Sequence, residues 1–370
     1  MPNVARNAEY TKEYNRKLIL RLLRTQPMSR AEIARQTGLT RASTSLIAAD
    51  LLAEGTVREL TPMEGLRGRM PTPLALCGTS GYAVGIFLNR DGCTAGVVDM
   101  CGKIVRQERL RMADAPDKMA PLSEAVARLI GGVPREKLCG IGVSAPGPLD
   151  GERGRILNPP RFDLWHRTDI APLLHEATGL PVYLENDATC LARYHIGRPE
   201  SLGSRNFLLM IVDSGIGSGV VSKGKVLKGG GYYTSELGHT SIDYRGRRCA
   251  CGNIGCLEEY AAIPKLLKDA PYTSWKQAVD ANDTEILQRE ADYLSAGIVT
   301  LTNLVSIDTV LLSGDLLYGT EKIAPLIEQR VNARSLHHED MPIKVAASSR
   351  APGIKILAAA DIAFERALTV

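Results

Sequence analysis

The stretch "HTSIDYRGRRCACGNIGCLEEY", residues 239–260, holds one histidine and three cysteines, although the whole chain has only 8 Cys and 6 His. Cys249, Cys251 and Cys256 follow a Cys-x-Cys-x4-Cys pattern, and His239 lies ten residues before Cys249. Three thiolates and one imidazole complete a tetrahedral metal site, which leaves no position open for a reactive water. The stretch therefore predicts a structural Zn²⁺ site. The alternative is four unconnected side chains in a loop.

Composition restricts the class of protein around this site. A chain of 370 residues is long enough for two or three domains with a large buried core. It contains no run of about 18 apolar residues, so we expect no membrane span. The N-terminus is polar and lacks a signal-peptide core, which favours a cytoplasmic protein. In that compartment cysteines are thiols or metal ligands rather than disulfides. We expect the remaining five to be small core residues: Cys77, Cys93, Cys101, Cys139 and Cys190.

Positive charge is concentrated at the front of the chain. Residues 1–80 hold 12 Lys and Arg against 7 Asp and Glu, whereas the rest of the chain holds 33 against 34. A solvated basic surface would explain this excess. A basic N-terminal domain is also typical of nucleic-acid binding, so the local pattern has to decide between the two.

Residues 15–60 predict a helix-turn-helix. The first helix has an apolar stripe, formed by Leu18, Ile19, Leu22 and Leu23. Ser29 and Glu32 have the spacing of a capping box, so a second helix begins there and ends at Gly38. Thr40 caps a third helix that runs to about Glu54. We expect this helix to pack inward through Thr44, Ile47, Ala48 and Leu51.

The outward face of the third helix and the segment after it predict DNA binding. Near the helix N-terminus, where a recognition helix meets base edges, stand Arg41, Ser43 and Ser45. "TVREL" (56–60) reads as a strand, and "GLRGRMPTPLAL" (65–76) as a basic loop and returning strand. Together they make a wing in which Arg67 and Arg69 grip phosphate or the minor groove. The module resembles the winged helix-turn-helix at the front of many bacterial repressors, and its partner is expected to be double-stranded operator DNA.

From about residue 80 apolar strands alternate with glycine turns. Residues 81–110 read as a three-strand meander, and "LCGIGVSAPGPLD" (138–150) as a buried strand that ends in a loop. "LPVYLENDATCLARYH" (180–195) is a strand, then Asn186-Asp187, then a helix. Residues 206–230 form a second hairpin, and "IDTVLLSGDLLYG" (307–319) a late buried strand. This α/β pattern, with polar residues at strand ends, predicts a ligand in a crevice between two lobes.

Four motifs carry a resemblance to a known family. "GIGVSAPGPLDGERGRILNPP" (140–160), "PVYLENDATC" (181–190), "ELGH" (236–239) and "CACGNIGCLEEY" (249–260) resemble those of the ROK family of repressors, open reading frames and kinases. The resemblance spans residues 10–370. It implies a winged helix-turn-helix over residues 1–78, then a two-lobed, actin-like and ribonuclease-H-like domain of the ROK sugar-kinase type over 79–370.

The resemblance also implies lobe boundaries and a sugar site. The first lobe takes about 79–195 with a C-terminal helix of about 351–370, and the second takes about 196–350. The family's sugar ligands match Asn186, Asp187, Glu236, His239 and Glu258, and its closing loops match Gly147 and Asn158. Carboxylates and amides read sugar hydroxyls by paired hydrogen bonds, and a metal that holds His239 and Cys256 would also fix both glutamates. A homodimer or a dimer of dimers is implied as well.

One motif separates a kinase from a regulator. The resemblance implies that ROK kinases carry Asp-x-Gly-Gly-Thr on the first hairpin, where this chain has Phe87 at the Asp and "NRD" at Gly-Gly-Thr. Phe87 cannot organise magnesium, and Asp315 replaces a glycine of the adenosine-side pair. We therefore expect no kinase activity, although Asp187 matches the family's catalytic base.

The expected function is a sugar-responsive transcriptional regulator, most simply a repressor of carbohydrate genes, with a sugar or sugar phosphate as effector. Two alternatives stay open at this stage. One is an ATP-dependent sugar kinase for a hexose or N-acetylhexosamine that carries a DNA-binding domain. The other is a regulator whose effector is a partner protein.

Overall fold

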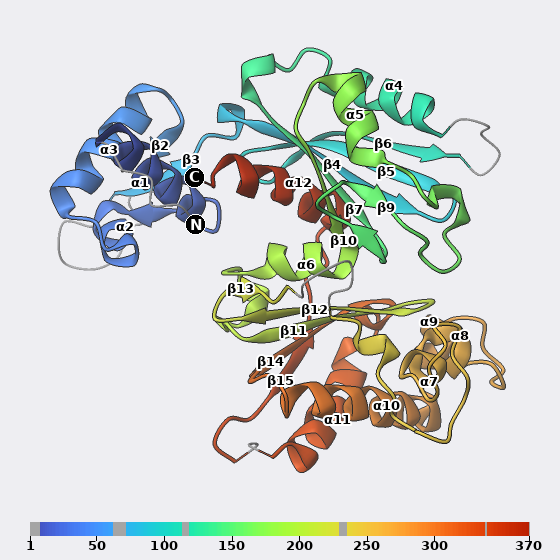
Figure 1. Ribbon diagram of the computed structural model, residues 1–370. Helices are drawn as coiled ribbons and strands as arrows, with labels where there is room; N and C mark the ends of the chain where they lie inside the picture. The colour runs from blue at the N-terminus through green and yellow to red at the C-terminus, as the bar shows by residue number, and fades with distance from the viewer. Residues whose placement is uncertain (1–7, 62–71, 113–117, 229–234, 337–338, 370) are drawn as a thin grey trace.

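The computed structural model describes residues 8–61, 72–112, 118–228, 235–336 and 339–369 (Figure 1). Its strands form a small three-stranded sheet near the N-terminus, two five-stranded sheets and a two-stranded ribbon. Figure 1 shows the N-terminal module at one side and the two larger sheets above and below a pair of helices, α6 and α12. The α/β, two-lobed architecture expected from the sequence is confirmed.

The N-terminal module follows the predicted winged helix-turn-helix. Its elements are α1 (Ala8–Leu23), β1 (Met28–Ser29), α2 (Arg30–Thr37), α3 (Arg41–Ala53), β2 (Val57–Glu59) and β3 (Pro73–Leu76). Ser29 and Glu32 form the capping box, and Gly38 ends α2 in the left-handed conformation. The side chain of Thr40 accepts a hydrogen bond from the backbone N–H of Ser43 and so caps α3. β3 pairs antiparallel with both β1 and β2.

The two large sheets share one topology. In the upper sheet of Figure 1 the strands are β4 (Tyr82–Asn89), β5 (Gly92–Asp99), β6 (Ile104–Arg111), β7 (Leu138–Ala145) and β10 (Val182–Asn186). In the lower sheet they are β11 (Phe207–Val212), β12 (Ile216–Ser222), β13 (Lys225–Val226), β14 (Thr309–Gly314) and β15 (Lys344–Ala347). Each sheet begins with an antiparallel meander whose first strand then pairs in parallel with a later strand. The strand orders, β6-β5-β4-β7-β10 and β13-β12-β11-β14-β15, therefore correspond position by position.

The remaining helices and a short ribbon lie around the two sheets (Figure 1). The helices are α4 (Met119–Ile130), α5 (Ile170–Thr178), α7 (Glu258–Ala261), α8 (Ile263–Leu266), α9 (Trp275–Asp280), α10 (Thr284–Thr302) and α11 (Thr320–Arg334). Strands β8 (Leu149–Asp150) and β9 (Arg155–Ile156) make the two-stranded ribbon. None of the described helices combines the length and the apolar character that a membrane crossing requires.

Helices α6 (Asp187–His195) and α12 (Ile354–Ala367) lie between the two large sheets. The approach of each helix to its sheet requires a glycine. A Cβ atom at Gly142 of β7 would lie 1.8 Å from the backbone oxygen of Ala359 in α12. A Cβ atom at Gly219 of β12 would lie 2.6 Å from the backbone oxygen of Ala188 in α6. Both separations are shorter than any real van der Waals contact, so only glycine allows these helices to pack directly on the strands.

The apolar core continues from the N-terminal module into the first lobe. Leu23, Leu74 and Leu76 of the module belong to the same buried cluster as Leu357 and Phe364 of α12. The expectation that the five remaining cysteines are core residues holds for Cys93 and Cys190, which are buried, but is wrong for Cys101, which is exposed. Cys101 stands in the turn after β5, where its thiol donates to the backbone oxygen of Leu76.

We predict that Gly142→Ala destabilises the protein, because the added methyl group meets backbone rather than a flexible side chain. Overpacking of this kind costs about 3 kcal/mol or more, which corresponds to a fall of about 6 °C or more in the midpoint of thermal unfolding. Gly203→Ala is the matched control, since its Cβ would meet nothing within 4 Å and only the left-handed backbone would be strained. That strain costs about 1–2 kcal/mol. An unchanged midpoint for Gly142→Ala would contradict the packing.

Candidate functional site

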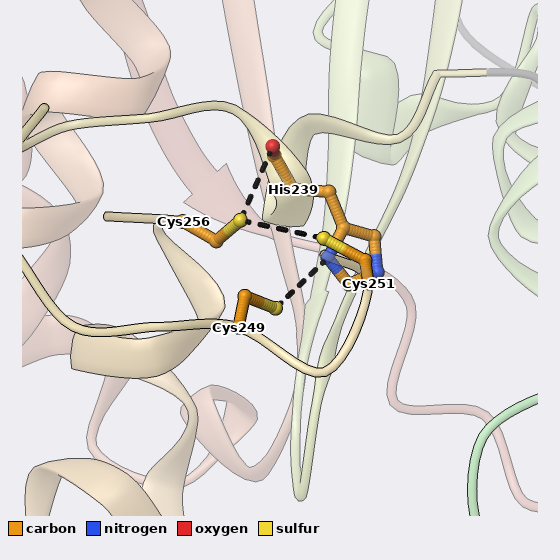
Figure 2. A group of neighbouring side chains, drawn as sticks. All are labelled: His239, Cys249, Cys251 and Cys256. Carbon is orange, nitrogen blue, oxygen red and sulfur yellow. Dashed lines mark hydrogen bonds between the residues drawn. The ribbon is translucent and has the colours of Figure 1, made fainter. Parts of the chain in front are cut away.

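The four potential metal ligands converge at the surface of the second lobe. His239 ends a short 3₁₀ helix (Leu237–His239), and the three cysteines come from the loop that leads into α7. The loop folds back on this helix, because Ser241 pairs with Cys256 and Arg248 with Ile254 in isolated β-bridges. Two segments ten residues apart in sequence are thereby brought face to face (Figure 2).

The distances between the donor atoms fit a tetrahedral metal ion. Cys249 Sγ lies 3.7 Å from His239 Nδ1, and Cys251 Sγ lies 3.7 Å from Cys256 Sγ. One donor atom from each of the four residues lies within 4.8 Å of all the others. A metal–sulfur distance of about 2.3 Å in a tetrahedron requires sulfur–sulfur separations of about 3.8 Å. The four side chains are therefore close enough together to hold one metal ion.

The ionisation of the thiols supports the same conclusion. Burial and the neighbouring thiols of Cys249 and Cys251 raise the pKa of the Cys256 thiol to about 12. Three sulfur atoms this close cannot all become thiolates unless a cation compensates their charge. A divalent ion supplies that charge and deprotonates coordinating thiols outright.

Asn186 and Asp187 stand where the sequence predicted, between β10 and α6. Asn186 caps α6, since its Oδ1 accepts the backbone N–H of Thr189 at 3.1 Å. The half-buried Asp187 accepts the N–H of Ala188 at 2.8 Å through Oδ1. Burial raises the pKa of the Asp187 carboxyl above its ordinary value, while the nearby Lys355 ammonium acts in the opposite direction. This part of the site therefore offers hydrogen-bond acceptors at the carboxyl end of β10, an edge strand of its sheet.

Three further residues of the predicted sugar set gather around Asp187. Burial raises the pKa of the Glu236 carboxyl above its ordinary value. Asp187 and Glu258 add to this shift, and His239 opposes it, so all three side chains lie within electrostatic range of Glu236. Glu258 Oε2 accepts the backbone N–H of Ile216, the first residue of β12, at 2.9 Å. Because Glu236 begins the segment that ends at His239, and Glu258 begins the helix after Cys256, the metal loop anchors both carboxylates.

Of the two loop residues in the set, Gly147 reaches the site directly. A Cβ atom there would lie 3.5 Å from Asn186 Nδ2 and 3.5 Å from Glu236 Oε1. Asn158 is exposed, one residue beyond Leu157, whose N–H donates to the backbone oxygen of Pro148 at 3.2 Å. No contact among the described residues joins Asn158 to the other members of the set.

The predicted DNA-contacting residues divide into three groups. Arg41 and Ser45 are exposed on α3. Ser43 is only half exposed, and its hydroxyl accepts a hydrogen bond from the hydroxyl of Thr40 at 2.8 Å. Arg67 and Arg69 lie outside the described residues.

Sequence reasoning missed a group of charged residues between the two hairpins. The Lys355 ammonium lies 4.4 Å from the centre of the Phe87 ring. Asp213 Oδ1 accepts the backbone N–H of Asp315 at 2.8 Å. Burial and the Asp213 carboxylate raise the pKa of the Asp315 carboxyl, whereas the Lys355 ammonium acts in the opposite direction. Arg90 in the first hairpin turn donates to Ser214 Oγ in the second at 2.7 Å. A lone lysine near a helix start gives no local signal, so only the fold could identify Lys355.

Comparison with known proteins identifies the family. Residues 83–362 match the model of the ROK family. The chain belongs to the ROK family. The xylose repressor of Bacillus subtilis (strain 168) is 27% identical to it over 340 residues, which are 88% of each chain.

Two solved structures of ROK proteins resemble the fold. A ROK family transcriptional regulator, described as a homolog of the E. coli MLC protein, has a TM-score of 0.76 and 24% identity. That likeness covers 97% of this chain and 96% of the regulator, so it includes the N-terminal module. A ROK hexokinase from Thermus thermophilus has a TM-score of 0.63 and 28% identity over 77% of this chain and 98% of its own.

We predict that the purified protein carries one metal ion per chain and that Cys251→Ser loses it, because three ligands cannot close the tetrahedron. Elemental analysis after gel filtration measures the number of metal ions per chain, which should fall from about one in the wild type to near zero in the variant. Cys101→Ser, which alters an exposed thiol outside the cluster, should keep the metal. Wild-type protein that contains no metal, or a Cys251→Ser variant that retains it, would contradict this assignment.

Proposed function

We propose that the protein is a sugar-responsive DNA-binding transcriptional regulator, and specifically a repressor of carbohydrate genes. The observation that carries this proposal is the union in one chain of a winged helix-turn-helix with a ROK body. The similarity to a protein named xylose repressor extends over 88% of this chain and supports the same function. The likeness to a ROK regulator includes the N-terminal module and supports the fold that this function needs.

The metal in this proposal is a structural zinc ion held by His239, Cys249, Cys251 and Cys256. A set of three cysteines and one histidine with tetrahedral spacing is typical of closed zinc sites. The ion would supply rigidity rather than chemistry. It would hold His239 in place directly, and Glu258 through the loop that precedes it, so that both side chains can contact the sugar.

The effector site in this proposal is formed by Asn186, Asp187, Glu236, His239 and Glu258, with the loops of Gly147 and Asn158 at its rim. Asp187 and the two glutamates accept hydrogen bonds from sugar hydroxyls, and Asn186 can both donate and accept. Half-buried carboxylates of this kind bind a sugar that offers a hydroxyl more strongly than an analogue that lacks it, because the analogue would leave the carboxylate partly desolvated and unpaired.

A kinase is the second candidate, because a ROK hexokinase shares the fold and Asp187 is present. The surroundings of Phe87 argue against it. Phe87 offers no oxygen to a magnesium ion, and Lys355 packs against its ring. The Arg90–Ser214 hydrogen bond joins the two hairpin turns that would have to open around phosphates. Asp213 and Asp315 would add negative charge beside a triphosphate.

Helix α12 provides the route from sugar to DNA in this proposal. α6, which starts at Asp187, packs on α12, and Arg193 of α6 donates to Glu365 of α12 at 2.6 Å. On the same half of α12, Arg24 of the N-terminal module donates to Asp361 at 2.5 Å, and its guanidinium lies 4.0 Å from the centre of the Phe364 ring. A shift of α6 on sugar binding would therefore reach the DNA-binding module through one helix.

The protein would act as a homodimer on a roughly palindromic operator. Two copies of α3 then enter successive major grooves about one helical turn apart. Sugar binding changes the spacing or orientation of the two modules and thereby lowers operator affinity.

We predict that an effector sugar and the operator weaken each other's binding by the same factor, in the range of about 5–150-fold, as linkage requires. Asp187→Asn should lower sugar affinity at least about tenfold, because it removes a charged acceptor. Its operator affinity without sugar should stay within about twofold of wild type. A thermal-shift screen of sugars and sugar phosphates identifies the effector. Calorimetry and fluorescence anisotropy then give the two affinities.

The same variant separates the two candidate functions. ATP-dependent turnover of any sugar, measured by ADP release and abolished by Asp187→Asn, would show that the protein is a kinase. Loss of residues 1–75 without loss of operator affinity would exclude the DNA-binding assignment.

We also predict that Asp361→Asn uncouples the two sites. It removes the carboxylate that holds Arg24, and touches neither the sugar residues nor α3, so each separate affinity should stay within about twofold. The factor by which sugar lowers operator affinity should fall at least about threefold. Asp292→Asn is the matched control, because it breaks an ion pair of the same length, with Arg330, on the second lobe. Full sugar response in Asp361→Asn would exclude this route.

A further inference from the structure

The outward face of α3 has an unusual composition for an exposed helix surface. The buried residues Thr44, Ile47, Ala48 and Leu51 define the inward face. On a helix of 3.6 residues per turn the opposite side is centred on Ala42, Leu46 and Ala49, and all three are exposed. Leu46 is 69% exposed and is the most exposed of the large apolar residues among described residues 8–61. The surface offered by the middle of this helix is therefore apolar, not charged.

The core of the module does not need Leu46. Ile47 and Leu51 are 6% and 0% exposed and fill the interior, so Leu46 contributes no comparable burial in the free protein. Leaving such a side chain in water forgoes about 25 cal/mol for each Å² of apolar surface, which a partner with an apolar group can recover.

The charges around Leu46 identify that partner as DNA. Residues 41–49 of α3 contain no acidic side chain. Arg41 is exposed five residues before Leu46, in the first turn of α3, and Arg35 is exposed on α2. The first acidic residue of α3, Asp50, is neutralised by Lys12 at 2.7 Å. A polyanion can thus approach the N-terminal half of α3 without meeting an uncompensated carboxylate.

The neighbours of Leu46 are small enough to let the helix enter a groove. Ala42 and Ala49 lie on the same line of the helix and project no further than a methyl group, so the backbone can come close to base edges. In the major groove the one apolar feature that a base pair presents is the C5 methyl group of thymine. We propose that Leu46 reads a thymine methyl group in each half of the operator. This inference rests on the proposed DNA-binding function and adds the base that the helix selects.

The test replaces single thymines by deoxyuridine, which removes the methyl group and leaves base pairing intact. The full-length protein first selects a tight duplex from a random library, and each thymine of the selected half-site is then substituted in turn. At one thymine per half-site, loss of the methyl should weaken wild-type binding about fourfold, which corresponds to one buried methyl group. Leu46→Ala should bind the thymine duplex more weakly and should no longer distinguish uracil from thymine at that position.

Two controls separate a methyl contact from other effects. Leu304→Ala removes an equally exposed leucine, 79% exposed, from the second lobe and should leave both affinities unchanged. Leu46→Ala should also keep the wild-type dependence of affinity on salt, since no phosphate contact is lost, whereas loss of a phosphate-contacting arginine reduces that slope. Because Leu46 is exposed, its loss should leave the thermal midpoint unchanged.

The outcomes distinguish failure of this inference from failure of the proposed function. If wild-type protein selects no duplex, the DNA-binding function itself is wrong. If it selects a duplex but Leu46→Ala binds as tightly as wild type, or still loses affinity on uracil substitution at every sensitive thymine, Leu46 does not read a methyl group and only the inference is overturned.

Discussion

The direct packing of two helices on the backbones of two sheets is the constraint on which the rest of this structure depends. Gly142 and Gly219 remove the side chains that would hold α12 and α6 away from their strands. With α6 this close to its sheet, Asp187 at the start of α6 lies against β12, where a Cβ atom at Gly217 would be 3.9 Å from Asp187 Oδ1. In the C-terminal half of α12, Asp361 accepts a hydrogen bond from Arg24 of the N-terminal module. A tightly packed layer transmits displacement, because interiors at this density rearrange in steps and do not compress.

The charged side chains between the two hairpins bear on the proposal that this chain is a regulator and not a kinase. A kinase of this fold would place magnesium and phosphates between the two hairpins. This chain has Phe87 with Lys355 above it, and Lys355 lowers the pKa of both Asp187 and Asp315 against the effect of burial. Lys355 is a cation of the chain itself, and it offsets part of the cost of burying these two carboxylates. In the proposed regulator the carboxylate of Asp187 would serve recognition alone.

Local sequence signals predicted local structure well, and the reason is physical. The capping box of Ser29 and Glu32, the cap at Thr40 and the spacing of the three cysteines each depend on residues only a few positions apart. Most of the proposed sugar-binding residues also gather around Asp187. These residues were expected from the resemblance to the ROK family and not from local spacing. The contacts that were missed, Lys355 on Phe87 and Arg24 on Asp361, join residues hundreds of positions apart. No periodicity or spacing encodes such pairs. Cys101 was misplaced because its apolar neighbours suggested burial, whereas the turn after β5 exposes it.

The orientation of His239 would let one side chain serve both the metal cluster and the proposed effector site. Its Nδ1 faces Cys249 across the cluster, so a metal bound there leaves the proton on Nε2. His239 then acts as a hydrogen-bond donor, while Asp187, Glu236 and Glu258 are acceptors when ionised. A sugar hydroxyl both donates and accepts hydrogen bonds. Ionised carboxylates only accept, so a site made of carboxylates alone would leave the hydroxyl oxygen without a donor. By fixing the tautomer, the metal loop would supply the donor that the three carboxylates lack, and the same loop sets the positions of two of them.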